Sequence, residues 1–294
     1  MATAGRVRLL LAIVSPALVV AACTGASVVS GAGQTGAPAS AGGSPTGSTS
    51  GAHGASTADV AAIRHAASTL LTTTDATLTC TRLLTPRLVR EVYETRKQCL
   101  AAPITVDATQ TSSVGDVAVH GRSAVVAVRT TDHQRVARGH LDYVEQGGRW
   151  RADRYEDDLV RSSLTAAVEQ PAKSGVLTSA ALRRCMVGKI RTLPITGLRS
   201  FFYASARNDP DVRDAAIDFV SACPKPLAAF VAHRLLSAVP RRGRSPAQLH
   251  CIETTMAQLL PVTGLEKKAL EQHVSPAVSA ALAGIVSGAE QSCR

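Results

Sequence analysis

The C-terminal half of the chain carries one pattern twice, and this duplication constrains the possible folds more than any other feature. Each copy runs from a cysteine through a Leu-Pro-apolar-Thr-Gly-Leu segment, at 193–198 and 260–265, to a second cysteine. The cysteine-to-proline spacings are 9 and 10 residues, and the spacings from proline to the second cysteine are 29 and 32. Because proline stops a helix and Thr-Gly can begin the next one, we expect two three-helix repeats, at about 179–224 and 246–294, joined by a helix over 225–239.

The last helix of each repeat has a start signal of its own. Pro210 follows Asp209, and Pro276 follows Ser275. This is the arrangement of a cap residue and a proline in the first helical turn. Residues 159–294 as a whole are therefore predicted to form an all-α domain.

The N-terminus has the composition of a targeting segment. Arg6 and Arg8 precede an apolar run over 9–20. At about 12 residues this run is shorter than the roughly 20 that a membrane span needs, and it suits a signal peptide. It ends in Val-Ala-Ala-Cys, which resembles the lipobox of bacterial lipoproteins. The resemblance implies cleavage after residues 1–22, lipidation of Cys23, and anchoring to the outer face of the cell membrane; an ordinary signal peptide with an incidental cysteine is the alternative.

A linker is predicted to follow the lipidated cysteine, so that residues 23–57 form one tethering segment. Residues 24–57 contain no Asp, Glu, Lys or Arg and consist mainly of Gly, Ala, Ser and Thr. Such a composition cannot bury a core. A flexible chain of this length would span roughly 30–35 Å, which would hold the folded part away from the lipid head groups.

Lipidation of Cys23 would account for one of the seven cysteines and leave an even number for disulfides in an oxidising compartment. The remaining six are Cys80, Cys99, Cys185, Cys223, Cys251 and Cys293. Six cysteines allow 15 pairings. The economical pairing closes each repeat through Cys185–Cys223 and Cys251–Cys293, each worth about 4 kcal/mol in the loop-entropy model, and pairing across the repeats is the alternative.

Residues 58–158 begin with helical patterns. Apolar residues recur at helical spacing over 58–74, and a second helix is predicted over about 84–100. Cys80 and Cys99 flank this second helix. A disulfide between them would close a 20-residue loop, worth about 3 kcal/mol in the same model.

The pattern then changes to a period of two residues, which is typical of strands. Alternating segments lie at 104–108, 116–120, 123–131, 134–146 and 149–155. Gly121 and Gly147-Gly148 mark turns between them, and a Gly-Gly pair is a good hairpin signal. Helices followed by such a meander, ending in Gly-Gly-Arg-Trp-Arg-Ala-Asp, resemble the NTF2-like family as it occurs in actinobacterial lipoproteins. The resemblance implies a cone in which a curved sheet wraps around helices, and hence an α+β fold with the all-α domain behind it.

The positive charge of the chain is unevenly distributed. Residues 58–160 hold 13 basic and 13 acidic side chains, whereas residues 161–294 hold 17 basic and 9 acidic ones. A basic helical domain could meet an anionic envelope polymer or lipid surface, because long-range fields raise encounter rates with opposite charge. A solvated face that aids solubility is the alternative. The export signal argues against nucleic acid as a partner.

The chain lacks the spacings that identify common catalytic and metal sites, such as His-x-x-x-His, Cys-x-x-Cys and Gly-x-Ser-x-Gly. We therefore expect no catalytic residue, cofactor or metal ion. His140 and Asp142 share one face of the strand 134–146 with Arg138, which favours a surface salt-bridge ladder. Alternatively, the histidine and the carboxylate act together inside the cone as a catalytic base. Phe201-Phe202-Tyr203 and Trp150 are expected in the core.

These observations lead to three hypotheses about function. The first is a non-enzymatic interaction lipoprotein, with the NTF2-like part as scaffold and the helical part docking a protein or polymer of the envelope. The second is a module that binds a small apolar ligand in an open cone. The third is an enzyme that uses His140 and Asp142, both inside the cone.

Overall fold

The computed structural model describes most of the chain from Ser56 onwards. The described residues are 56–102, 104, 110–132, 135–169, 175–207, 212–237, 239, 241, 243–270 and 274–294. The predictions for Cys23, for nearly all of the linker, for Asp209 and Pro210, and for the strand 104–108 beyond its first residue lie outside this range.

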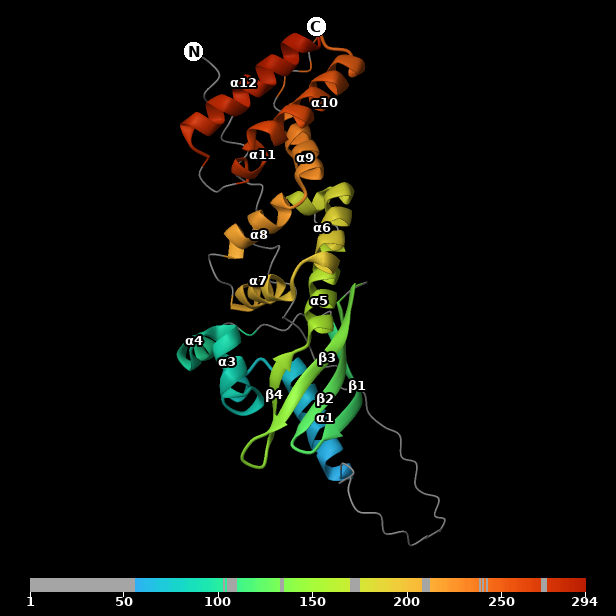
Figure 1. Ribbon diagram of the computed structural model, residues 1–294, viewed down its shortest axis with the longest axis vertical. Coiled ribbons are helices and arrows are strands. Elements are labelled where there is room, and N and C mark those ends of the chain that lie inside the picture. Colours follow the sequence, from blue (N-terminus) through green and yellow to red (C-terminus); the bar gives the residue numbers. More distant parts are fainter. Residues whose placement is uncertain are drawn as a thin grey trace, which may run out of the picture.

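The described residues form an α+β fold, in which a four-stranded sheet lies at one end of a long stack of helices (Figure 1). The strands are β1 (Gln110–His120), β2 (Ser123–Asp132), β3 (Arg135–Glu145) and β4 (Trp150–Tyr155). They lie side by side in chain order and are all antiparallel. Gly121 lies in the turn between β1 and β2, and Gly147 and Gly148 lie in the turn before β4; their φ angles of 63°, 61° and 70° are ones that glycine adopts readily.

The strand β1 is longer than the sequence predicted, because it begins at Gln110 and not at Asp116. The polar segment Gln-Thr-Ser-Ser has no alternation of apolar residues, so it carries no strand signal of its own. Its pairing with β2 supplies the missing information. A bulge between Val114 and Val117 interrupts the register.

The first helical region is more broken than expected. It contains α1 (Thr57–Thr72), α2 (Ala76–Leu78), a π-helical turn (Thr79–Leu83), α3 (Pro86–Tyr93) and α4 (Arg96–Ala101). The predicted single helix over 84–100 is therefore wrong. The chain turns at Glu94, whose φ is 63°, and Thr95 starts the next helix by accepting a hydrogen bond from the amide of Gln98.

The helix α1 lies against one face of the sheet, and the space between them is filled by side chains. Ile63 and Ala67 of α1 are fully buried, and so are Val126 of β2 and Leu141 of β3. Trp150 at the start of β4 is also buried, as the sequence predicted.

The second half of the described chain is entirely helical. Its elements are α5 (Asp157–Glu169), a 3₁₀ turn (Val176–Thr178), α6 (Ala180–Thr192), α7 (Ile195–Arg207), α8 (Val212–Ser221), α9 (Pro224–Leu236), α10 (Pro246–Thr263), α11 (Leu265–Lys268) and α12 (Pro276–Ser292). The buried residues of the sheet and of these helices form one contiguous cluster. The predicted boundary after residue 158 falls inside α5, which starts at the end of the sheet and leads into the stack (Figure 1).

The two prolines of the duplicated motif act differently. Pro194 separates α6 from α7, as predicted, and the residue before it is extended, as proline requires. Pro261 lies inside α10, so the prediction that it stops a helix is wrong. That helix ends only at Gly264, a left-handed position that glycine adopts easily. Proline near the end of a helix removes one hydrogen bond only, and neighbouring side chains can still hold the last turn together.

The six cysteines form three disulfides, which are the pairs that the spacing favoured. Cys80 is bonded to Cys99, Cys185 to Cys223 and Cys251 to Cys293. The first joins the π-helical turn to α4, the second joins α6 to the start of α9, and the third joins α10 to the end of α12.

Candidate functional site

Two polar regions stand out: a junction where the sheet meets the helices, and a groove on α9. The junction is built where β4 no longer covers β3. β4 pairs with β3 only from Leu141 to Glu145, and on the N-terminal side of Leu141 the edge of β3 is hydrogen-bonded to α5 instead. The amide of His140 donates to Asp158 Oδ1 at 3.1 Å, and the amide of Arg138 donates to Ser162 Oγ at 2.9 Å. Gly139 lies between these two residues, and only its lack of a side chain lets α5 approach so closely.

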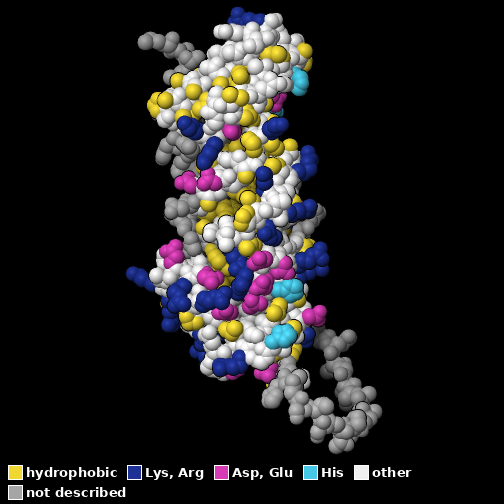
Figure 2. Space-filling view, viewed as in Figure 1, with side chains coloured by type: hydrophobic (Ala, Val, Ile, Leu, Met, Phe, Trp, Pro, Cys, Tyr) yellow, Lys and Arg dark blue, Asp and Glu magenta, His cyan; other side chains and the backbone are white. Residues whose placement is uncertain are grey.

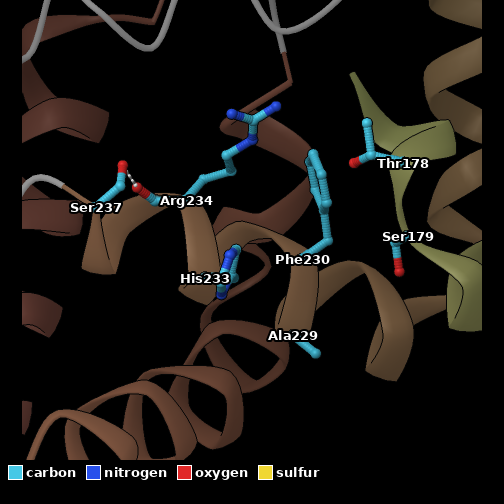
Figure 3. A pocket seen from close by; sticks show the side chains of 7 residues that line it. All are labelled: Thr178, Ser179, Ala229, Phe230, His233, Arg234 and Ser237. Atoms are coloured by element: carbon cyan, nitrogen blue, oxygen red, sulfur yellow. Dashed lines mark hydrogen bonds between the residues drawn. The ribbon is translucent and has the colours of Figure 1, made fainter. Parts of the chain in front are cut away.

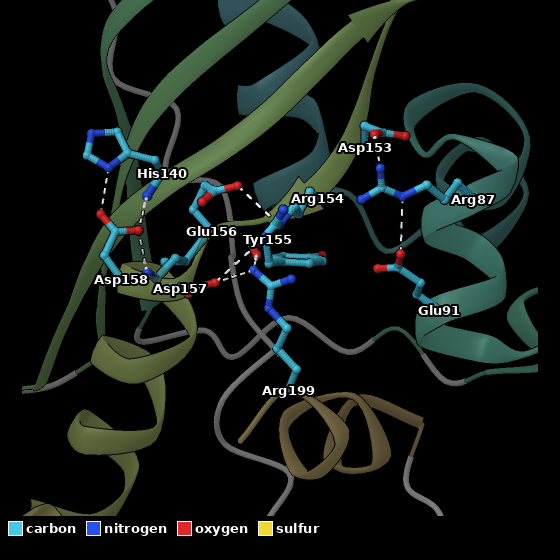
Figure 4. A network of polar contacts seen from close by, with 11 residues as sticks. Arg87, Glu91, His140, Asp153, Arg154, Tyr155, Glu156, Asp157, Asp158 and Arg199 are labelled. Atoms are coloured by element: carbon cyan, nitrogen blue, oxygen red, sulfur yellow. Dashed lines mark hydrogen bonds and ion pairs between the residues drawn. The ribbon is translucent and has the colours of Figure 1, made fainter. Parts of the chain in front are cut away.

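His140 and Asp142 lie on the outer face of β3. Their neighbours Leu141 and Tyr143 point into the core, so the alternating strand turns the histidine and the aspartate away from it. The His140 ring is about half exposed, and its Nδ1 lies 2.6 Å from Asp158 Oδ2 of α5 (Figure 4). The interior pair that the enzyme hypothesis requires is therefore not the observed arrangement. The predicted ladder along the strand is also wrong, because the partner of His140 comes from α5.

Asp142 has a second carboxyl group as its neighbour. Partial burial and a hydrogen bond with Glu156 raise the pKa of Asp142 to about 6, although Arg154 opposes the shift. A hydrogen bond between two carboxyl groups requires one of them to carry a proton, and two adjacent negative charges repel each other, so the pKa of one group rises. This part of the junction can therefore change charge just below neutral pH.

We expect the variant Asp142→Asn to be more stable than the parent at pH 7.5 by about 1 kcal/mol, a value reduced for the solvent screening of a half-exposed group. The pKa of Asp142 is raised by folding, so the folded protein takes up a proton that the unfolded chain does not. Stability of the parent should rise as the pH falls from above 6 towards 4. Urea unfolding at pH 7.5 and pH 5 measures both effects.

The matched control is Asp116→Asn, which changes an exposed carboxylate on β1. It should keep the parental difference in stability between the two pH values, whereas Asp142→Asn should lose most of it. An Asp142→Asn protein with the parental pH dependence would show that this carboxyl group does not carry the effect.

Arginines complete the junction and connect it to the helical stack (Figure 4). Arg154 of β4 binds Glu156 at 3.2 Å. Arg199 of α7 binds Asp157 and also donates to the carbonyl of Tyr155 at 3.0 Å. The two carboxylates at the start of α5 also suit the positive end of that helix. In Figure 2, acidic and basic side chains gather where the sheet meets the helices.

Aromatic residues pack beneath these ion pairs. The ring of Tyr155 lies 5.6 Å from that of Phe202 in an edge contact, and 6.1 Å from that of Tyr203. Phe202 and Tyr203 are buried, as predicted, and Phe201 stacks on Phe219 at 5.8 Å. Burial raises the pKa of Tyr203 to about 12. The sheet and the stack are therefore joined by a packed contact as well as by charges.

An open cone is not found among the described residues between α1 and the sheet. Ile63, Val126 and Leu141 are fully buried by protein atoms, and Tyr143 is 1% exposed. These four side chains pack closely where the hypothesis would place the ligand. Binding of a small apolar ligand stays a prediction that this packing does not support.

The groove is a separate feature of the helical part. It has a volume of about 500 Å³ and lies between the Val176–Thr178 turn and α9. The residues that line it are Thr178, Ser179, Ala229, Phe230, His233, Arg234 and Ser237. Phe230 and Arg234, one helical turn apart, extend to the same side of α9, and Thr178 faces them (Figure 3). The guanidinium carbon of Arg234 lies 5.5 Å from the centre of the Phe230 ring.

The sequence did not single out this groove. Its main residues lie in the segment 225–239, which was predicted only as a joining helix. The Phe230–Arg234 spacing of four residues places both side chains on one helical face, and this was the signal that could have indicated a pair. The opposite wall, near Thr178, comes from a distant part of the chain and carries no sequence signal.

A basic face lies on α6 of the helical part. It consists of Arg184 and Arg191, which are two helical turns apart on one side of α6, and neither forms an ion pair with a described residue. Figure 2 shows Lys and Arg side chains at intervals along one edge of this part. The surplus positive charge predicted for residues 161–294 therefore includes cations that no carboxylate of the described chain neutralises.

The described residues contain no group of three His, Cys, Asp or Glu side chains placed to hold a metal ion. Within the same residues no single helix is long and apolar enough to cross a membrane; Asp214–Ser221 and Pro224–Leu236 meet that test only together, with a bend of 109° between them. Comparison of the chain with protein-family models, with curated proteins and with solved structures gave no match.

Proposed function

We propose that this chain is a lipid-anchored interaction protein of the cell envelope, whose helical part docks an acidic protein. The observation that carries the proposal is the basic face of α6. Arg184 and Arg191 are exposed, and both lack a carboxylate partner within the described residues. Charges arranged in this way steer a partner of opposite sign during encounter.

The anchor and the architecture belong to the same proposal. Lipid on Cys23, on the outer face of the cell membrane, would tether the chain, and residues 58–158 would serve as an NTF2-like scaffold. The four-stranded meander over α1 supports that assignment. A duplicated disulfide module is supported by the two pairs Cys185–Cys223 and Cys251–Cys293, which each close a run of helices in the same order.

A rigid junction suits a scaffold of this kind. Arg199 binds the start of α5 while the Tyr155, Phe202 and Tyr203 rings pack below it. A partner bound to the helices would therefore be held in a fixed position relative to the sheet, because the two parts cannot move apart without breaking these contacts.

The proposal is tested with the mature chain and a labelled poly-L-glutamate oligomer. We expect binding that weakens as salt is raised, and a loss of affinity of about tenfold at low salt for the double variant R184E/R191E, because rim charges act mainly through the encounter. Surface plasmon resonance measures the association rate that should account for most of this loss.

The matched control is R129E/R149E, which makes the same charge change at exposed positions of the neutral α+β unit. It should bind within about twofold of the parent if the basic face is the docking surface. Equal losses in both double variants would contradict the proposal. Binding to vesicles of anionic lipid without binding to polyglutamate would also contradict it and would point to a membrane surface.

A further inference from the structure

We infer that the groove on α9 receives one carboxylate of an acidic peptide segment, and that the guanidinium of Arg234 binds it. This inference rests on the proposed function, and it adds the position of the binding site on the helical part and the chemical group of the ligand that binds there.

Arg234 is a half-buried arginine for which the described part of the chain supplies no acceptor. Other half-buried arginines of the described chain are bonded: Arg161 donates to the carbonyls of Ile190 and Leu193, and Arg199 to Asp157. Further cases are Arg135 with Asp132, Arg154 with Glu156, Arg183 with the Leu177 carbonyl, and Arg244 with Glu290. Within the described residues, Arg151 also has a buried Nε without an acceptor, but Arg151 does not line the groove.

The Phe230 ring holds this cation in place. The guanidinium lies 5.5 Å from the ring centre, a contact that attracts the charge without using its N–H groups. The donors of Arg234 therefore remain available at the wall of a concave site of about 500 Å³, a volume typical of ligand pockets. A cation in a fixed orientation loses little entropy when it binds, because its side chain is already ordered.

The other polar groups in the groove already have partners. His233 Nδ1 lies 2.9 Å from Glu253 Oε1. Thr178 donates to the carbonyl of Gly175, and Ser237 donates to the carbonyl of Arg234. Among the described residues that line the groove, Arg234 is then the cation without an acceptor, and it lies beside the apolar surfaces of Ala229 and Phe230.

This set matches a single planar carboxylate attached to an apolar neighbour. A guanidinium presents parallel N–H groups that fit the two oxygens of a carboxylate. A phosphate polymer or a lipid surface is contacted better by several cations on an open face than by one cation in a groove. We therefore assign the groove to a glutamate or aspartate side chain of a peptide that approaches along the basic face.

The test uses the mature protein and a short peptide of alternating leucine and glutamate, with the glutamine version as a blank. Fluorescence polarisation should show binding of the glutamate peptide that the glutamine peptide lacks. Arg234→Gln should weaken that binding at least tenfold, whereas Arg184→Gln, the same charge change on the basic face, should weaken it less than twofold. Arg234→Lys should restore only part of the affinity, because it keeps the charge and loses the paired donors.

A second measurement avoids any effect of the substitution on folding. In the parent protein labelled at arginine, titration with the glutamate peptide should shift the Nε–H signal of Arg234 more than that of Arg184. Equal losses for the two glutamine variants, together with no shift at Arg234, would overturn the inference and leave the proposed function standing. A parent protein that binds polyglutamate but not the glutamate peptide would do the same, whereas failure to bind polyglutamate would overturn both.

Discussion

Replacing Gly139 by alanine is expected to lower the free energy of unfolding by about 3 kcal/mol or more. A Cβ atom at this position would lie 2.4 Å from the amide nitrogen and 2.5 Å from the Cα of Leu159. These are backbone atoms of α5, so no side-chain rotation can relieve the overlap. The helix must move away from β3, and the overpacking cost adds to the loss of the contacts that α5 makes with the strand edge.

The structural consequence should be local to the junction. If α5 moves, the amides of Arg138 and His140 lose the side-chain oxygens of Ser162 and Asp158. Hydrogen exchange at these two amides should therefore accelerate more than exchange in β2, and urea unfolding followed by circular dichroism gives the change in stability.

The matched control is Gly188→Ala, in the exposed face of α6, where an added Cβ meets nothing within 4 Å. Alanine is a better helix former than glycine, so this variant should be stabilised by up to about 1 kcal/mol. A Gly139→Ala protein with the stability of the parent would mean that α5 does not need its close approach to β3.

Removal of the Cys185–Cys223 disulfide, as C185A/C223A, is expected to cost about 4 kcal/mol. The bond has a sequence separation of 38 residues, and the loop-entropy model assigns this amount to a loop of that length. For a folded part of this size the midpoint of thermal unfolding should fall by about 8–16 °C. Cys223 is also buried and stands immediately before the first residue of α9, so loss of its disulfide should loosen the helix that carries the groove.

The comparison is with C80A/C99A, whose shorter loop predicts a smaller loss of about 3 kcal/mol on the far side of the junction. Scanning calorimetry of the oxidised proteins measures both midpoints. The parent protein after full reduction should unfold below either double variant, because it lacks all three constraints. A C185A/C223A protein that unfolds within about 2 °C of the parent would contradict the expected contribution.

Local patterns in the sequence predicted much of the fold. Turns at Gly121 and Gly147-Gly148 are glycine positions with positive φ, and the alternation around them identified β2, β3 and β4. The disulfide pairs are the ones that the sequence favoured: two by the position of the cysteines in the duplicated pattern, and Cys80–Cys99 by its place on either side of one predicted helix. These features depend on neighbours along the chain, which is the information that a single sequence carries directly.

The predicted bounds of helices and strands were wrong where another residue nearby, or pairing with another strand, outweighed the local sequence signal. Pro261 was expected to stop a helix, but it lies so near the end of α10 that the turn holds and Gly264 provides the stop. The helix predicted over 84–100 breaks at Glu94, because Thr95 offers a new cap. The polar start of β1 had no pattern and became a strand through pairing with β2.

For the candidate sites, the sequence indicated which side chains share a face but not which distant residues contact them. His140 and Asp142 could be placed on one strand face from the sequence, since side chains alternate along a strand. The sequence could not show that the His140 side chain pairs with Asp158 of α5, nor that Glu156 forms a hydrogen bond with Asp142. The groove needed Thr178 and Arg234 to be brought together from two distant segments.

The sequence by itself determined the duplicated pattern, most elements of secondary structure and the surplus of positive charge on the helical part, and it favoured the disulfide pairs without settling them. Each of these follows from residue type and spacing. Only the tertiary structure decided that α5 hydrogen-bonds to the edge of β3, that side chains pack between α1 and the sheet, and that Arg234 lies over the Phe230 ring without an acceptor among the described residues. The physical reason is that packing and electrostatic pairing depend on which distant segments of the chain come into contact. Residue spacing along the sequence does not show which segments those are.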